Sequence, residues 1–522
     1  MSTVVAPGKG RWWALGALAL SLLAVGLDLT VLNVALPTMS VSLRADTGQL
    51  QWIANAYTLV LAATLLPAGQ LGDRYGRKKL LVAALLVFGM ASAACAYAPN
   101  TGALIAARAV LGLAAAFLMP LSLSVLAVLF TPAERPKAVA VWATANSIGI
   151  PLGPIVGGWL LDHFWWGAVF LINLPLVVIA VIATGVLVPE SRSTTRPRLD
   201  PLGVLLSALG LLGITYGLIR AGGQGWGDGL AITTLVGGVV VTAFFVVWQR
   251  RTAHPLADMT LFSSRAFTWG TVLTTVVNFA MFGLLFALPQ YFQAVNAASA
   301  LVTGLRLLPM IGGLLLGVRV ADRIGRRVAP RPIIASGYVF LAGGLALGAL
   351  TGPHTGYGFI ATWLTIMGFG LGFTMPTAMA VAISPLTAER SGAGSALQQA
   401  LRQVGGAVGV AVLGTVLNSA YQSHLSLNGL PAPVAGAVRG SVNAGVRVAA
   451  ALRSPELLAG VRAAFTHGMD VTLWVSAGIA AVAVLLAIVF LPRRSATMSG
   501  NGTTHADDEV GVVTRTEREV IA

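Results

Sequence analysis

The stretch that decides the fold is a basic turn that occurs twice. The first copy is Gly69-Gln70-Leu71-Gly72-Asp73-Arg74-Tyr75-Gly76-Arg77-Lys78-Lys79, and the shorter second copy is Ala321-Asp322-Arg323-Ile324-Gly325-Arg326-Arg327. The second copy is degenerate, since Val318 stands where the first has Gly69. Because apolar runs flank both copies, the pattern is typical of membrane proteins built from internal repeats. The sequence therefore predicts two related sets of membrane helices.

Composition indicates that most of the chain lies in a bilayer. Of the 522 residues 56% are hydrophobic and 10% are charged, with a mean hydropathy of +0.82, which leaves too little polar surface for a soluble globule. A helix needs about 20 apolar residues to cross a bilayer. The sequence predicts an all-α integral membrane protein with fourteen spans, near residues 12–35, 50–70, 79–98, 103–128, 138–161, 167–188, 201–219, 230–249, 268–292, 302–320, 332–351, 357–382, 395–418 and 469–491.

The two basic turns divide these spans into sets. Each turn follows the second span of a set of six, which leaves the seventh and eighth spans as an inserted pair. We expect the substrate path between the two sets. The predicted organisation is a cytoplasmic N-terminus (1–11), a first six-helix bundle (12–188), the inserted pair with a cytoplasmic linker (189–267), a second six-helix bundle (268–491) with an extracellular segment (419–468), and a disordered cytoplasmic tail (492–522).

The distribution of positive charge predicts the orientation. One side, which holds both termini, carries 24 of the 33 Lys and Arg residues, and the opposite loops carry six. Positive loops face the cytoplasm, so both termini are assigned there. The net charge of +15 is thus a membrane signal and predicts no nucleic-acid partner. Arg outnumbers Lys 29 to 4, a bias expected of a high-GC bacterium, so we expect a multi-pass protein of the bacterial inner (cytoplasmic) membrane.

Asp28 is predicted to lie well inside the first span. An ionised carboxylate in hydrocarbon costs at least ~2.5 kcal/mol, so Asp28 must face a polar cavity, pair with a cation or take up a proton. If it also attracts a cationic substrate, protons and substrate compete for one group, as antiport requires. The alternative is a structural carboxylate bonded to a neighbouring helix.

Arg108 is the basic residue well inside the fourth span, and Asp28 is its candidate partner. The alternative for Arg108 is a packing role with bonds to backbone carbonyls. Arg306 and Arg402 lie within a few turns of a membrane face, where long side chains reach water. Asp470 begins the last span, a position that suits a carboxylate. We therefore expect proton coupling and substrate binding at Asp28 and Arg108.

The fifth span carries a row of small residues. Gly149, Gly153 and Gly157 recur every fourth residue and so lie on one helical face, which permits close contact with another helix. Pro151 and Pro154 disturb the backbone hydrogen bonds of the same segment. Such packing would seal a leak pathway, although an ordinary small-residue interface gives the same pattern.

The remaining candidate residues are predicted to line a substrate cavity, and the absence of several motifs argues against an enzyme or a metal protein. An aromatic and polar lining suits planar or cationic drugs, but most such side chains simply face lipid or the protein core. The sequence contains no phosphate-binding Gly-x4-Gly-Lys-Ser/Thr motif, no HExxH and no Cys/His cluster, so we predict neither ATP hydrolysis, nor a metal, nor an enzyme. The candidate lining residues are Asn33, Tyr57, Trp142, Asn278, Gln290 and Tyr291.

Several motifs together resemble the major facilitator superfamily, and within it the fourteen-helix drug:proton antiporter branch. The basic turn at 69–79 and Leu104-x3-Arg108-x3-Gly112 are similar to superfamily motifs. The stretch Gly149-x3-Gly153-Pro154-x2-Gly157-Gly158 is similar to the antiporter motif of the exporters. Residues 27–37, 170–175, 288–291 and 392–406 resemble signatures of the fourteen-helix branch.

The resemblance implies a fold, a function and residue roles. The implied fold has two six-helix bundles plus two inserted helices, and the implied function is proton-coupled export of amphipathic or cationic drugs by alternating access, without a cofactor. The partners are then a small drug-like molecule, protons and the bilayer, and a monomer suffices. In the gating loop, Gly69, Gly76 and their neighbours form a turn in which Asp73 meets a helix dipole and Arg74, Arg77 and Lys78 meet acidic or carbonyl partners. A dedicated exporter of a metabolite, lipid or siderophore is the alternative.

Overall fold

The structure, a computed structural model, describes residues 10–131, 133–192, 199–427 and 429–492. Within these ranges the regular secondary structure is helical, without a strand, and fourteen helical segments are long and apolar enough to cross a membrane. The predictions of an all-α chain and of fourteen spans are confirmed. Most of the predicted N-terminal segment (1–11) and nearly all of the predicted tail (492–522) lie outside the described residues.

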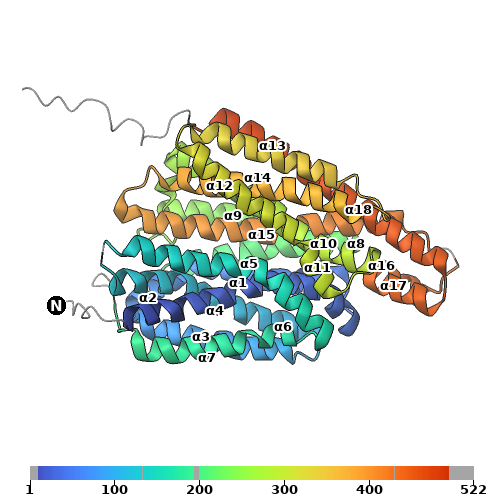
Figure 1. Ribbon diagram of the computed structural model, residues 1–522, viewed down its shortest axis with the longest axis horizontal. Helices are drawn as coiled ribbons and strands as arrows, with labels where there is room; N and C mark the ends of the chain where they lie inside the picture. The colour runs from blue at the N-terminus through green and yellow to red at the C-terminus, as the bar shows by residue number, and fades with distance from the viewer. Residues whose placement is uncertain (1–9, 132, 193–198, 428, 493–522) are drawn as a thin grey trace, which may run out of the picture.

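The first half of the molecule is defined here as α1 to α7 and the second half as α10 to α18, and Figure 1 shows them as two groups of long, roughly aligned helices. The first half comprises α1 (Gly10–Ser42), α2 (Thr47–Tyr75), α3 (Arg77–Ala96), α4 (Thr101–Leu129), α5 (Arg135–His163), α6 (Ala168–Leu171) and α7 (Asn173–Leu187). Two further long helices, α8 (Pro201–Gln224) and α9 (Gly229–Arg251), pack on each other, and α8 also contacts α2 and α15.

The second half begins after a short 3-10 helix, η1 (Met259–Ser263). It comprises α10 (Arg265–Gln290), the π-helix η2 (Tyr291–Val295), α11 (Ala300–Arg306), α12 (Leu308–Gly325), α13 (Pro330–Gly348), α14 (Tyr357–Ile383), α15 (Ala388–His424), α16 (Ala432–Gly440), α17 (Val442–Ala451) and α18 (Pro455–Phe490).

Proline explains why two predicted spans are broken. The predicted helix at 302–320 is divided at Leu307 into α11 and α12, and the predicted helix at 167–188 is divided at Ile172 into α6 and α7. Pro309 and Pro175 follow the two breaks. Proline has no N–H to donate, and its ring clashes with the carbonyl four residues earlier, which favours a break at these two points. Other helices, such as α2 at Pro67, continue through a proline.

The segment 419–468, predicted as an extracellular loop, is largely helical. Helix α15 continues to His424, α16 and α17 form two short helices, and α18 begins at Pro455 instead of the predicted residue 469. The helix therefore begins fourteen residues before the predicted start of the last span. Arg462 and His467 lower the hydropathy of the first turns of α18, so a search for apolar runs does not detect them.

The two ends of the bundle differ. We call the end with the turns at 75–77 and 326–330 the basic end, and the opposite end, where α16 and α17 lie, the outer end (Figure 1). At the outer end the halves are joined by hydrogen bonds: Gln293 Nε2 donates to the Val34 carbonyl at 2.9 Å, and Thr47 Oγ1 donates to the Gly440 carbonyl at 3.0 Å. The Ser40 and Ser441 hydroxyls are 2.8 Å apart.

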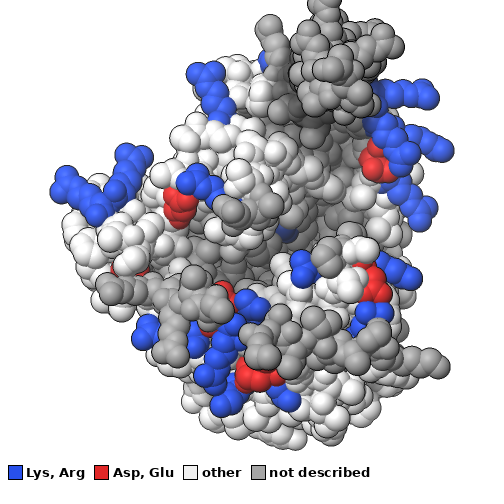
Figure 2. Space-filling view, turned by 90° about the vertical axis from the view of Figure 1, so that its left-hand side faces the viewer, with Lys and Arg blue, Asp and Glu red and all other residues white. Residues whose placement is uncertain are grey.

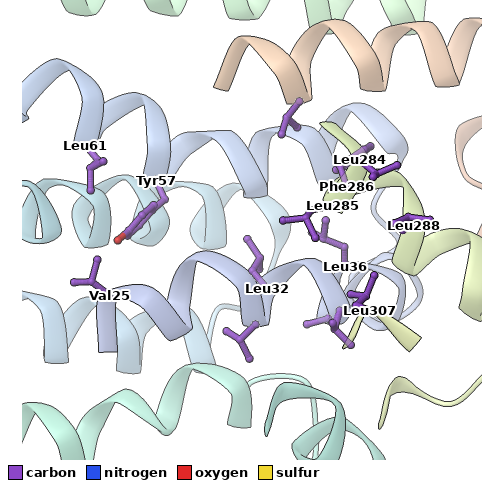
Figure 3. Packing of buried hydrophobic residues seen from close by; sticks show 14 of the residues in the cluster. Val25, Leu32, Leu36, Tyr57, Leu61, Leu284, Leu285, Phe286, Leu288 and Leu307 are labelled. Atoms are coloured by element: carbon purple, nitrogen blue, oxygen red, sulfur yellow. The ribbon is translucent and has the colours of Figure 1, made fainter. Parts of the chain in front are cut away.

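Apolar packing reinforces the outer end. Figure 3 shows Leu32 and Leu36 of α1 near Leu285 and Phe286 of α10, and all four belong to one buried cluster. Among the described residues, the basic end lacks such a cap, and no hydrogen bond joins the halves there. Figure 2 views this face, where Lys and Arg gather around its rim and the middle is hollowed. The bundle is therefore closed at its outer end and open toward its basic end.

Candidate functional site

The candidate site is built around a buried ion pair between α1 and α4. Arg108 Nη1 donates to Asp28 Oδ2 at 2.5 Å, and the two side chains are 2% and 0% exposed. Both residues lie in membrane-spanning helices, so each charge is removed from water and is compensated by the other. The structure thus brings together the two residues that were predicted to couple protons and substrate.

The surroundings of the pair leave polar atoms without a partner. The Arg108 guanidinium lies over the Tyr57 ring, 4.5 Å from its centroid, and Nε donates to the Ile53 carbonyl at 3.4 Å. Among the described residues, Asp28 Oδ1 and the Tyr57 hydroxyl accept or donate no hydrogen bond. Buried polar atoms are rarely left unbonded, so this cluster has capacity for a proton, water or a ligand group.

The fourth-span motif Arg108-x3-Gly112 has a direct structural explanation. A Cβ on Gly112 would lie 2.9 Å from the Tyr57 Cα, so only glycine permits α4 to approach α2 this closely. The same approach places the Tyr57 ring against the Arg108 guanidinium one turn earlier on α4. Gly112 therefore permits the close approach of α4 to α2, and Arg108 uses this approach to contact the Tyr57 ring.

The glycine face of α5 packs on the helix that carries Asp28. A Cβ on Gly149 would lie 2.9 Å from the Leu27 nitrogen, and one on Gly153 would lie 3.0 Å from the Val31 nitrogen. Gly157 meets the Val31 side chain in the same way. The α1 residues involved lie on the turns that bracket Asp28.

The other end of the same motif contacts the opposite half. A Cβ on Gly158 would lie 2.6 Å from the Ala300 carbonyl oxygen, and the Pro154 carbonyl abuts Gly304 of α11. Pro151 is only half-buried. Asp162, at the end of α5, accepts hydrogen bonds from the Ser299 hydroxyl at 2.8 Å and the Ala300 N–H at 3.1 Å. Helix α5 therefore connects the Asp28 helix to the outer junction between the halves.

The predicted gating loop is tightly organised, but by a residue that the sequence did not indicate. Gly76 has a φ of +120°, and a Cβ there would lie 2.8 Å from Glu190 Oε1, so this position requires glycine. The Glu190 carboxylate accepts the backbone N–H groups of Lys78 at 3.2 Å and Lys79 at 3.3 Å. Glu190 thus occupies the positive end of α3, where a carboxylate is stabilised.

The contact of Asp73 with a helix dipole, which the resemblance implies, stays a prediction. Asp73 lies on the last turn of α2, and its Oδ1 accepts from Arg77, the first residue of α3, at 2.7 and 2.9 Å. The Arg74 guanidinium lies 5.5 Å from the centroid of the Tyr75 ring. A Cβ on Gly69 would make only an ordinary 3.6 Å contact with Pro120, so the structure gives no reason for glycine there.

The predicted lining residues are dispersed. Asn33 Nδ2 donates to the Leu29 carbonyl of its own helix, and Trp142 Nε1 donates to Ser122 Oγ at 2.9 Å. Asn278 donates to the Arg402 carbonyl at 3.1 Å. Gln290 and Tyr291 are buried at the far end of α10, where the Tyr291 hydroxyl donates to the Gly352 carbonyl at 2.9 Å. Tyr57 alone of this group contacts the ion pair, and the cavity role of the others stays a prediction.

A second ion pair ties the start of α1 to the loop between α4 and α5. Glu134 accepts from Arg11 at 2.7 and 2.8 Å and from the Thr131 hydroxyl at 2.9 Å. The hydrogen bond from Thr131, with the charge of Arg11, holds the pKa of Glu134 below its ordinary value. Three acids that form such contacts belong to no sequence motif: Glu134, Asp162 and Glu190. Each accepts hydrogen bonds from residues more than 100 positions away in the chain.

Within the described residues, no group of three or more His, Cys, Asp or Glu side chains is placed to hold a metal ion. The one cysteine, Cys95, is buried. The chemistry of the site is therefore that of one buried carboxylate, one guanidinium and the Tyr57 ring.

Comparison with known proteins places this arrangement in a family. The model of the Major Facilitator Superfamily matches residues 18–410. The chain is 35% identical over 492 residues to the multidrug efflux pump LfrA of Mycolicibacterium smegmatis, covering 93% of this chain and 96% of that protein. It is 31% identical to the tetracenomycin C resistance and export protein of Streptomyces glaucescens, covering 79% and 77%.

A solved structure shares the fold. A bacterial homolog of the human lysosomal transporter Spinster, in an inward-facing and unoccupied conformation, superposes with a TM-score of 0.69 at 16% identity, covering 94% of this chain and 99% of that one. The predicted fold class is thereby confirmed, and the family is one of transporters and not of enzymes. On the strength of the matched family model and of these relatives, the chain belongs to the major facilitator superfamily.

Proposed function

We propose that this protein exports small amphipathic or cationic compounds across the cytoplasmic membrane in exchange for protons, with Asp28 as the group that binds the proton. The observation that carries the proposal is the buried Asp28–Arg108 pair, whose second carboxylate oxygen has no hydrogen-bond partner among the described residues. Neutralising Asp28 removes the attraction to Arg108, so protonation changes the energy of this contact between α1 and α4.

The packing supplies a route from Asp28 to the junction between the halves. Helix α1 packs through Leu27 and Val31 on the glycines of α5, and α5 packs through Gly158 on α11. A shift of α1 on protonation is therefore transmitted to the outer junction. Because the bundle is closed at the outer end, and the basic end is assigned to the cytoplasm by its positive charge, the conformation corresponds to the inward-facing state of an alternating-access cycle.

The nature of the cargo follows from the relatives and from the chemistry of the pair. LfrA is named as a multidrug efflux pump and the Streptomyces glaucescens protein as a resistance and export protein. A cationic compound that approaches Asp28 competes with Arg108 and with the proton for the same carboxylate, so binding of one disfavours the others. The Tyr57 ring holds the Arg108 guanidinium 4.5 Å from its centroid, so an organic cation that displaces Arg108 gains the same aromatic face.

The test is ethidium efflux from cells with an imposed proton gradient. Asp28→Asn keeps the size of the side chain and removes its charge, and Asp322→Asn, at an exposed acid of the second basic turn, is the matched control. We expect gradient-dependent efflux by the wild type and by Asp322→Asn, and efflux at the vector level by Asp28→Asn at equal amounts in the membrane.

Two results would contradict the proposal in different ways. Normal gradient-dependent efflux by Asp28→Asn would remove Asp28 from proton coupling. Failure of the wild type to move ethidium or any other cationic dye would argue against a broad cationic cargo and in favour of a dedicated substrate.

A further inference from the structure

The feature that leads beyond transport is a pocket at the outer end of the second half. It has a volume of about 630 Å³ and lies where the end of η2, the end of α11 and the starts of α14 and α18 meet. Its polar lining includes Arg306, Arg462 and His354. Its apolar wall includes Leu458, Ala459 and Ala463 of α18. The pocket therefore combines positive charge with an apolar surface.

The two guanidinium groups form no ion pair within the described residues. Arg306 lies between two rings, 5.6 Å from the Phe292 centroid and 5.4 Å from the Tyr357 centroid. Arg462 donates from Nε to the Ala294 carbonyl at 3.3 Å. Several N–H donors of the pair are therefore available to an anion, for which the guanidinium fork is suited.

Helix α18 connects this pocket to the surface that faces lipid. Ala463 and Trp474 are eleven residues apart, so they lie about 20° from each other around the helix. Trp474 is 54% exposed. Leu485, a further eleven residues along the helix, lies on nearly the same face and is exposed as well. Between Ala463 and Trp474 on this face lie His467 and Asp470, so the surface below the pocket is first polar and becomes apolar and exposed from Trp474 on.

The position of the pocket along α18 matches the depth of lipid headgroups. Arg462 is 28 residues before Phe490, the last residue of the helix, which corresponds to about 42 Å at a rise of ~1.5 Å per residue. A bilayer is about 40–45 Å thick including its headgroups. If the end of α18 lies at the cytoplasmic interface, Arg462 lies at the level of the outer headgroups.

From this geometry we propose that the pocket binds the phosphate of an anionic phospholipid. Arg306 and Arg462 bind the phosphate, and an acyl chain lies along the exposed apolar face of α18 from Trp474 on. A free phosphate ion shares the headgroup chemistry but leaves this apolar face unused, so we expect the lipid to bind more tightly. Such a lipid would attach the starts of α14 and α18 to each other on the outer side.

The experiment measures lipid binding by the purified full-length protein in detergent, by native mass spectrometry and by the shift in unfolding temperature. The probes are dioctanoyl phosphatidylglycerol, dioctanoyl phosphatidylcholine and inorganic phosphate. The test variant is Arg306→Gln/Arg462→Gln, the charge-retaining variant is Arg306→Lys/Arg462→Lys, and the matched control is Arg453→Gln, which removes one outer positive charge outside the pocket lining.

We expect the wild type and Arg453→Gln to bind phosphatidylglycerol more tightly than the other two probes. The Gln variant should bind it about tenfold more weakly, since two charge-assisted contacts are lost, and the Lys variant should recover part of the affinity. Equal binding of phosphatidylglycerol by the wild type and the Gln variant would overturn the site. Inorganic phosphate that binds as tightly as the lipid would overturn its assignment to lipid.

Discussion

The two copies of the basic turn have similar sequences but different structures. In the first copy, Gly76 has a left-handed φ, and Glu190 binds the start of the next helix. The Asp73–Arg77 pair spans 2.7 Å, with side chains 33% and 19% exposed. In the second copy, Asp322 and Arg326 are 3.4 Å apart and 73% and 78% exposed. Sequence similarity between repeats therefore does not ensure an equal structural role.

The same contrast holds for the buried arginines. Arg108 of the first half forms an ion pair with Asp28, whereas Arg402 of the second half donates to the Gln399 side chain at 3.0 Å and to no carboxylate of the described residues. The first half thus pairs its buried arginine with an acid, and the second half, within the described residues, does not. This difference predicts that a substitution in the first half lowers the stability of the protein more than the matched substitution in the second half.

The largest difference is expected for the arginines. Arg108→Gln leaves the Asp28 carboxylate buried without a cation, and removing one partner of a buried pair destabilises a protein by about 3–5 kcal/mol. Arg402→Gln leaves no buried acid behind, so we expect a clearly smaller loss. The measurement is the unfolding temperature of each purified variant in detergent.

A double variant sharpens this comparison. Asp28→Asn/Arg108→Gln leaves no unpaired charge, so it should be more stable than Arg108→Gln alone. If the double variant is as unstable as the sum of the two single variants, the pair contributes no coupling energy, and the difference between the halves has another origin.

The second prediction concerns the glycines of the two turns. Gly76→Ala forces a Cβ into a left-handed conformation and toward the Glu190 carboxylate, for which we expect about 1–3 kcal/mol of destabilisation. A Cβ on Gly325 would meet only the Ile333 side chain at 3.8 Å, so Gly325→Ala should be nearly neutral. Thermal unfolding of both variants tests this, and equal stability of the two would contradict the assigned strain.

The sequence predicts a feature correctly where the signal is local, such as a charged residue inside an apolar run or glycines at every fourth position. The fourteen spans follow from the length of apolar runs, and Asp28 and Arg108 are conspicuous because charges inside such runs are rare. The period of Gly149, Gly153 and Gly157 predicts close packing of α5, and the structure adds that its partner is α1.

The features that were missed depend on tertiary contacts. Glu190 is 112 positions from Lys78, whose N–H it accepts, and one acid after an apolar run carries no information about a distant helix. The first turns of α18 mix apolar residues with Arg462 and His467, so a search for apolar runs does not reveal that the helix begins at Pro455. The contact of Gly158 with α11 depends on how the two halves meet, which no local pattern specifies.

The smallest difference is expected for the aspartates of the two turns. Asp73→Asn removes a partly exposed pair with Arg77, and such pairs contribute at most ~1 kcal/mol. Asp322→Asn removes a longer, mostly exposed contact, so its effect on the unfolding temperature should be undetectable. Because the Coulomb part of the Asp73–Arg77 contact is screened, high salt should reduce the difference between the two variants. A difference that persists unchanged in high salt would mean that Asp73 acts through its hydrogen bonds to Arg77 and not through its charge.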